Sequence, residues 1–320
     1  MLSLVSVVCV IGVVAYGGFV GLSSLAVLRR HAAAQTGPSG SRATTLPRGN
    51  GELAVVVTKG ETGSPDIYTL SPDGSNIRRL THTQVQVNPF NTEPAWSPDG
   101  KRIAFSRNLT SIVVMSADGT HQSRLTTNRN GADVYPAWSP DGTRIAFARG
   151  DDTTNTTAIY IMNSNGSGLT MLPGSTGGTQ PAWSPDGKSI IYVVVESETS
   201  SRLAIESAAG GPPTYLPTGP TGGFFPTWSP DGKYIAYSTG AGIWAIRADA
   251  SSPPAQVARD GTEPTWSPDG RQMAFTYKGR IWIVTLPTSM NRVAQRVVEL
   301  PALGGGLRMG EPAWQAVVAP

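Results

Sequence analysis

The stretch Pro94-Ala95-Trp96-Ser97-Pro98-Asp99-Gly100 decides the fold, because close copies of it recur along the chain. Pro-x-Trp occurs six times, and the first five copies continue as Ser-Pro-Asp-Gly. Successive tryptophans of these copies lie 42, 45, 45, 38 and 48 residues apart. A period of about 40–50 residues is typical of four-stranded propeller blades. The tryptophans are Trp96, Trp138, Trp183, Trp228, Trp266 and Trp314.

Short alternating runs of β-branched and aromatic residues follow each copy, such as 102–105 and 112–115. Such runs favour strands, and none of them has the 3.6-residue period of a helix. Residues 51–57 match the second strand of a unit, and its missing first strand is Pro312-Ala313-Trp314. The sequence therefore predicts an all-β, six-bladed β-propeller over residues 51–320, in which the N- and C-terminal strands build one blade together.

The repeated tryptophans and aspartates have structural explanations. One Trp per blade at a fixed offset suits packing between adjacent sheets, where each ring buries about 150–250 Å². In Ser-Pro-Asp-Gly, Pro sets φ for a type I turn, Asp bonds local backbone and Gly takes a positive φ. Metal binding is the alternative role for the aspartates, but one per blade would lie far apart around the ring. They are Asp99, Asp141, Asp186, Asp231 and Asp269.

The N-terminal segment contains an uncharged, mostly apolar run from Leu2 to Leu28. A run of this length is sufficient for a membrane-spanning helix. We expect residues 1–30 to be one N-terminal transmembrane anchor or a signal segment, and residues 31–50 to be a flexible linker. A cleavable signal would end near Ala34, but its apolar run would be unusually long and no Lys or Arg precedes it.

Charge and motifs exclude several classes of function. Four of the 25 Lys and Arg residues precede residue 51, so the part that follows carries 21 of them against 22 acidic residues. A nearly neutral body lacks the electrostatic signature of a nucleic-acid-binding protein. The single cysteine, Cys9, allows no intrachain disulfide. Neither a Gly-x-Ser-x-Gly motif nor a phosphate-binding P-loop occurs. We predict no cofactor, no metal and no enzymatic activity.

The five Pro-x-Trp-Ser-Pro-Asp-Gly copies and the terminal Glu311-Pro312-Ala313-Trp314 resemble the TolB-like propellers, also called PD40 or WD40-like repeats. The resemblance covers residues 51–320, whereas the Gly-His and Trp-Asp markers of true WD40 repeats are absent. It implies a bacterial, protein-binding propeller at the cell envelope, because TolB binds a peptidoglycan-associated lipoprotein in the periplasm. TolB also has an N-terminal α/β domain, in whose place this chain has its leader and linker.

The loops of a propeller divide between two faces. The turn face carries the tight turns between strands 1 and 2 and between strands 3 and 4 of each blade. The connection face carries the longer, more varied strand 2–3 loops and the connections between blades. Loops presented by a rigid scaffold carry function, so we place binding on the connection face. The six residues before each Pro-x-Trp, called the pre-proline residues below, should line the central channel mouth there. They are Glu93, Tyr135, Gln180, Phe225, Glu263 and Glu311.

Other polar and aromatic residues are expected near this mouth. They are His82, Arg107, Arg129, Asp133, Arg149, Asp151, Asp152, Phe224, Tyr277 and Lys278.

Three carboxylates and two aromatic rings at one mouth suit a peptide or a cation. The first hypothesis is a membrane-tethered, non-catalytic and monomeric propeller scaffold that binds a protein or peptide, with no nucleic-acid partner. Its body would be periplasmic or extracellular, although Arg29 and Arg30 leave the cytoplasmic face open. The alternative is a propeller hydrolase or lyase that uses the mouth carboxylates and a metal.

Overall fold

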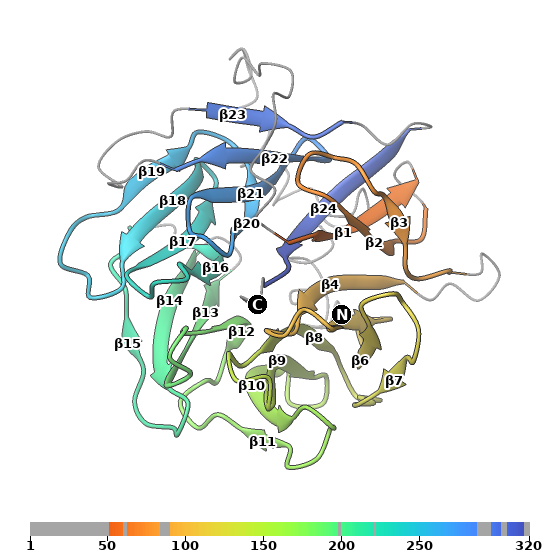
Figure 1. The fold of residues 1–320 in the computed structure, drawn as a ribbon. Helices are drawn as coiled ribbons and strands as arrows, with labels where there is room; N and C mark the ends of the chain where they lie inside the picture. Colours follow the sequence, from red (N-terminus) through yellow and green to blue (C-terminus); the bar gives the residue numbers. More distant parts are fainter. Residues whose placement is uncertain are drawn as a thin grey trace.

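The computed structural model describes residues 51–59, 63–83, 90–197, 200–219, 222–286, 296–301 and 306–316. Their twenty-four strands form six four-stranded sheets, arranged as blades around a central axis (Figure 1). The predicted all-β, six-bladed propeller is therefore confirmed. The described residues contain no helix, and so none that could cross a membrane. The expected anchor 1–30 and linker 31–50 lie outside the described residues.

The strands of each blade are given from the innermost to the outermost. Blade 1 has β24 (Leu307–Trp314), β1 (Leu53–Lys59), β2 (Asp66–Leu70) and β3 (Arg78–Arg79); blade 2 has β4 (Asn91–Trp96), β5 (Arg102–Arg107), β6 (Ser111–Ser116) and β7 (Ser123–Arg124); blade 3 has β8 (Asp133–Trp138), β9 (Arg144–Asp151), β10 (Thr156–Asn163) and β11 (Thr170–Met171). Blade 4 has β12 (Gly178–Trp183), β13 (Ser189–Ser197), β14 (Ser200–Ser207) and β15 (Thr214–Tyr215); blade 5 has β16 (Phe224–Trp228), β17 (Tyr234–Thr239), β18 (Gly242–Arg247) and β19 (Ala255–Ala258); blade 6 has β20 (Thr262–Trp266), β21 (Gln272–Tyr277), β22 (Arg280–Thr285) and β23 (Arg296–Glu299).

Blade 1 closes the ring with strands from both ends of the propeller. β24 pairs antiparallel with β1, and Leu53 lies opposite Trp314. Gln315 reinforces this closure on the turn face. Its side chain accepts the N–H of Glu52 at 2.9 Å and donates to the carbonyl of Gly100 in blade 2 at 3.0 Å. The predicted closure by the two ends is thus present, and it leaves β1 without a free edge.

The repeated tryptophans pack between neighbouring blades. Trp138 of blade 3 lies in one apolar cluster with Ala104 and Val114 of blade 2. Its indole N–H donates to the carbonyl of Ala95 at 3.2 Å, and the Arg102 guanidinium lies 4.5 Å from the ring centroid. Five of the six rings are buried, and Trp228 is half-buried. Each blade is therefore joined to the preceding one by an aromatic side chain.

The Ser-Pro-Asp-Gly segments form tight turns on the turn face. In blade 2 the N–H of Gly100 donates to the carbonyl of Ser97, and Asp99 accepts the N–H of Lys101 at 3.1 Å. Gly100 has φ of 66°, a conformation that favours glycine. In blade 3, hydrogen bonds from Ser139 and Thr143 lower the pKa of Asp141 to about 2. These aspartates thus act as acceptors within their own turns.

The hairpin of β9 and β10 in blade 3 extends beyond the alternating apolar run of the sequence. β9 continues to Asp151, and β10 begins at Thr156. Asp151 and Thr156 pair across the hairpin, and Asp151 also accepts the N–H of Thr153 at 2.8 Å. Polar residues can extend a hairpin beyond the core because backbone pairing needs no apolar side chain, so an apolar pattern underestimates the strand length.

Candidate functional site

Each pre-proline residue lies in a β-bulge of an innermost strand. In blade 2 the pairing shifts between Thr92 and Ala95, so Glu93 and Pro94 together face a single residue of β5. Proline lacks an N–H and is tolerated in sheets at bulges, which explains the Pro of the repeat. All six pre-proline residues have φ between 51° and 56°, a left-handed conformation that is uncommon outside glycine.

Three glutamates join blades 6, 1, 2 and 3 through one hydrogen-bonded arc. Oε2 of Glu263 accepts the backbone N–H of Glu311 at 2.8 Å. Oε2 of Glu311 accepts the N–H of Glu93 at 2.5 Å, and Oε2 of Glu93 accepts the N–H of Tyr135 at 2.7 Å. Each carboxyl group therefore bonds the equivalent backbone position in the next blade.

A second, shorter arc joins blades 4 and 5. Oε1 of Gln180 accepts the N–H of Phe225 at 2.7 Å. Each arc ends on an aromatic residue. Tyr135 of blade 3 and Phe225 of blade 5 then meet edge to face, with ring centroids 6.3 Å apart and planes at 71°. Because blade 4 lies between them around the ring, this contact crosses the central channel.

The pre-proline residues are less accessible than a channel mouth suggests. Glu93, Gln180 and Glu263 are buried, whereas Tyr135 and Phe225 are half-buried. Burial is the main cause that raises the pKa of Glu93 to about 7, and the charge of Glu263 raises it further. Burial likewise raises the pKa of Glu263. The structure thus links all six residues through the two arcs and the contact of Tyr135 with Phe225, and it leaves none of them fully exposed as an open rim would require.

Oε1 of Glu263 is a buried atom of this ring that has no hydrogen-bond partner among the described residues. The side chains of Tyr135 and Gln180 interact with each other. A buried polar atom that lacks a partner is costly, so Oε1 of Glu263 can bind a polar group that reaches it. The described residues contain no group of three or more His, Cys, Asp or Glu side chains placed to hold a metal ion. The ring can thus hold blades together and accept polar ligand atoms.

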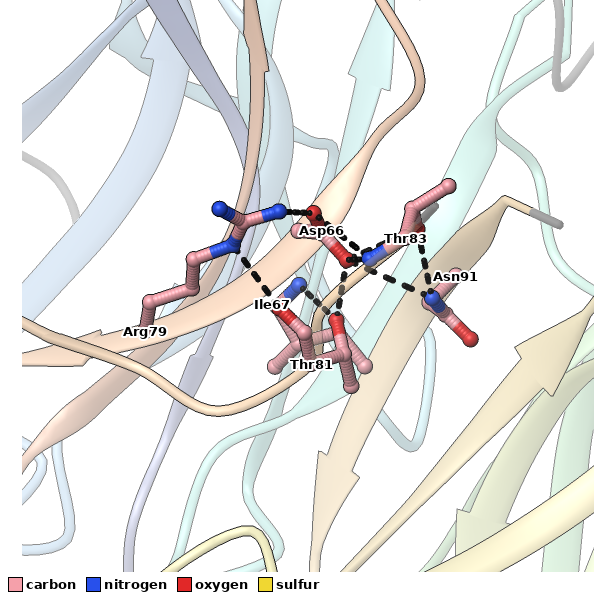
Figure 2. Close-up of polar contacts among 6 residues, drawn as sticks. All are labelled: Asp66, Ile67, Arg79, Thr81, Thr83 and Asn91. Atoms are coloured by element: carbon pink, nitrogen blue, oxygen red, sulfur yellow. Dashed lines mark hydrogen bonds and ion pairs between the residues drawn. The ribbon is translucent and has the colours of Figure 1, made fainter. Parts of the chain in front are cut away.

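A buried network beside blade 1 was missed by sequence reasoning. Oδ1 of Asp66 accepts from the hydroxyls of Thr81 and Thr83 at 2.6 and 2.9 Å, and Asp66 also pairs with Arg79 (Figure 2). Thr81 in turn accepts the N–H of Ile67 at 2.9 Å.

The same bond to the start of a third strand recurs in two other blades. Thr126 accepts the N–H of Ile112, and Ser175 accepts the N–H of Ile159, both at 2.9 Å. A Ser or Thr shortly after the fourth strand of these three blades is the sequence signal that identifies this feature. It satisfies a backbone donor that is buried between strands.

Comparisons with known proteins agree with this architecture. The model of the TolB beta propeller domain, PD40, matches residues 85–253, just over half of the chain. TolB from Acinetobacter baumannii superposes with a TM-score of 0.68 at 20% identity, over 83% of this chain and 66% of that one. The chain thus spans just under two thirds of the length of that TolB.

Two further solved structures are similar. The putative TolB from Agrobacterium tumefaciens has a TM-score of 0.61 at 20% identity, over 82% of this chain and 98% of that one. A chain of a nidogen/laminin complex gives 0.64 at 10% identity, with the same coverage. These likenesses show the fold alone, and no curated protein matches the chain. On the family match and its repeats, the chain belongs to the TolB β-propeller domain family.

Proposed function

We propose that this protein is a non-catalytic propeller scaffold that binds a protein or peptide on its connection face. The observation that carries the proposal is the pair of arcs formed by the pre-proline residues. Their carboxyl groups hold backbone amides of neighbouring blades, a structural task that favours a rigid scaffold over acid–base chemistry. The half-buried Tyr135 and Phe225 supply aromatic contacts for a partner.

Site-specific photo-crosslinking in cells of the source organism tests this proposal. A crosslinking amino acid at Arg129, an exposed residue after blade 2, reports on the connection face. The same amino acid at Arg271, an exposed residue beside a Ser-Pro-Asp-Gly turn, reports on the turn face. We expect a discrete crosslinked protein from Arg129 only, weakened by the double substitution Tyr135→Ala and Phe225→Ala. Identical products from both positions would contradict the proposal.

The hydrolase or lyase alternative makes a different prediction. A catalytic metal would be bound in stoichiometric amount, and chelation would remove it together with part of the thermal stability. Metal analysis and thermal unfolding of the purified chain, with and without chelator, distinguish the scaffold from the hydrolase or lyase. An unchanged unfolding midpoint after chelation supports the scaffold.

The proposal includes the expected membrane tether, with residues 1–30 as anchor, residues 31–50 as linker and the body on the extracytoplasmic side. Both Leu53 and Trp314 lie at strand ends on the turn face, so the linker joins the propeller there. A flexible linker of this length spans roughly 25 Å on average, and because it is attached on the turn face it leaves the connection face free to bind a partner.

Cell fractionation tests the tether. We expect the full chain in the membrane fraction and a chain lacking residues 1–30 in the soluble fraction. External protease should digest the body in intact spheroplasts. Protection of the body would place it in the cytoplasm instead.

A further inference from the structure

Blades 2 and 3 each place an arginine at the same position of the second strand. Arg107 lies opposite Asn91 in blade 2, and Arg149 lies opposite Asp133 in blade 3. Each guanidinium lies over the phenylalanine two residues earlier in its strand, with its central carbon 5.1 and 5.4 Å from the respective ring centroid. The two sites are therefore matched in backbone and in the phenylalanine beneath the arginine, whereas Arg149 also lies over Tyr160, whose counterpart in blade 2 is Val113.

In blade 3 the arginine is neutralised within the blade. Nε of Arg149 donates to Oδ1 of Asp133, and an η nitrogen donates to Oδ2, both at 2.7 Å. Asp133 is fully buried. This two-point contact is the geometry in which guanidinium and carboxylate groups fit each other best. The scaffold thus shows which chemical group this arginine position accepts.

In blade 2 the neutralising carboxylate is replaced by an amide. Nε of Arg107 donates to Oδ1 of Asn91 at 3.0 Å, and an η nitrogen donates to Oε1 of Gln122 at 2.6 Å. Nδ2 of Asn91 points toward Thr83 and Asp66, while Asp66 itself pairs with Arg79 (Figure 2). Among the described residues, no carboxylate lies within ion-pair distance of Arg107.

A second positive charge lies in the row of Phe105, the residue beneath the Arg107 guanidinium. Phe105 pairs with Val113, and Val113 pairs with Arg124. In blade 3 the outer position of the corresponding row is Met171. Arg124 is exposed and forms no ion pair with a described residue. Blade 2 therefore differs from blade 3 in two ways that each make the local charge more positive by one unit. Asn91 replaces the Asp of blade 3, and Arg124 replaces its Met.

The surroundings of Arg107 disfavour its positive charge. Burial lowers the pKa of Arg107, and the neighbouring charge of Arg124 lowers it further, while Asp66 opposes the shift. A half-buried cation that has only neutral acceptors gains from an incoming anion. Asn91 and Gln122 occupy two of the five N–H donors of its guanidinium, which leaves donors for a ligand.

We propose that Arg107 and Arg124 form a binding site for a carboxylate of a partner protein, an Asp or Glu side chain that binds the guanidinium donors which Asn91 and Gln122 leave free. The site lies where β5 ends on the connection face, beside the seam between blades 1 and 2. The inference rests on the proposed function, and it specifies that the partner protein has an acidic residue at its binding surface. Pairing of this kind gives register and orientation to an interface.

Fluorescence anisotropy with a labelled tetraglutamate peptide tests the site on the purified full chain in detergent, at low ionic strength. The variants Arg124→Met and Asn91→Asp each install the residue of blade 3. We expect either one to weaken binding at least fivefold. Arg271→Met removes the same charge from the turn face and should change the affinity less than twofold. Circular dichroism identifies a misfolded variant, in which case the other decides alone.

Substitutions that make blade 3 resemble blade 2 test whether a second peptide-binding site can be created. Asp133→Asn combined with Met171→Arg gives blade 3 the counterparts of Asn91 and Arg124, and the peptide stoichiometry should rise from one to two. Absence of binding to the unmodified chain, or equal weakening by Arg124→Met and Arg271→Met, would overturn the inference. Inorganic phosphate and acetate can each be tested as competitors of the peptide at equal ionic strength. If phosphate displaces the peptide far better than acetate does, the assignment to a carboxylate is overturned. Partner crosslinking from Arg129 without peptide binding would refute this site and leave the proposed function standing.

Discussion

The backbone N–H of Glu93 donates to Oε2 of Glu311 at 2.5 Å, although 218 residues separate the two in sequence. Glu311 lies on β24, the strand that closes blade 1, and Glu93 lies on the innermost strand of blade 2. Since Glu263 of blade 6 accepts the N–H of Glu311, the closing strand is bonded to both neighbouring blades at the channel. Two carboxyl groups therefore support the blade that closes the ring, and the carboxyl group of Glu93 continues the arc to blade 3.

This arrangement makes stability depend on pH. Glu93 has a pKa of about 7 in the folded chain, above its ordinary value of 4.5, so the folded state holds its proton over a range where the unfolded state has lost it. Stability from this group is complete below about pH 4.5 and is lost as the pH rises through 7. The loss is on the order of 3 kcal/mol.

Glu93→Gln removes this dependence while keeping an acceptor for Tyr135, as Gln180 does for Phe225 in the second arc. Urea unfolding at pH 5 and pH 8.5 is the measurement. We expect the variant to match the unmodified chain at pH 5 and to exceed it at pH 8.5. A variant that is less stable by the same amount at both values would show that Glu93 ionises at its ordinary pKa in the folded chain.

Removal of the closing strand should abolish the native fold. A chain that ends at residue 306 lacks β24, which exposes one edge of β1 and the apolar side chains of Leu53, Val55 and Val57. Burial of each such side chain is worth about 1.5–3 kcal/mol, and the total stability of a domain is only about 5–15 kcal/mol. We expect aggregation in size-exclusion chromatography. A chain that ends at residue 316 keeps β24 and Gln315 and serves as the control.

The tryptophans should differ in cost according to burial and bonding. Trp138→Phe removes a buried indole and its hydrogen bond to Ala95, whereas Trp228 is half-buried and its indole N–H has no partner. We expect Trp138→Phe to cost about 1–2 kcal/mol more than Trp228→Phe. Chemical denaturation of the two variants measures the difference, and equal costs would contradict the assigned role of the Ala95 bond.

The contact between Tyr135 and Phe225 should appear as a coupling energy. Its edge-to-face geometry is worth about 0.5–1.5 kcal/mol beyond the burial of each ring. A double-mutant cycle with Tyr135→Ala and Phe225→Ala measures this quantity. Strictly additive losses would mean that the two rings stabilise the channel separately.

Periodic features of the sequence predicted the architecture well. Pro-x-Trp fixed the number of blades, because proline marks the bulge and tryptophan the packing between blades. The closure of the ring could be predicted because the first repeat unit of the sequence lacks its first strand, and the C-terminal end supplies an additional first strand. These features repeat, so a single sequence displays them several times.

The internal arrangement of the site was harder to predict. Placing Glu93 at the channel required only its position in the repeat, whereas its bond to Tyr135 depends on the left-handed backbone of the bulge. The contact between Tyr135 and Phe225 links blades that are not neighbours, so no repeat spacing reveals it. Arg149 and Asp133 were each noted as candidates, but their pairing, and its absence at Arg107, required the strand register.

The pairing of Leu53 with Trp314 sets the order of events during biosynthesis. Blade 1 contains the first strand of the propeller to leave the ribosome, yet its innermost strand is the last to be made. Throughout translation the nascent chain thus presents an unpaired edge at β1, a surface that invites association with other chains. Joining ends so far apart costs only slightly more than joining near ones, because closure entropy grows with the logarithm of length. The ring consequently matures in a final step, after the segment 307–314 has emerged, and that step is where chaperones would act.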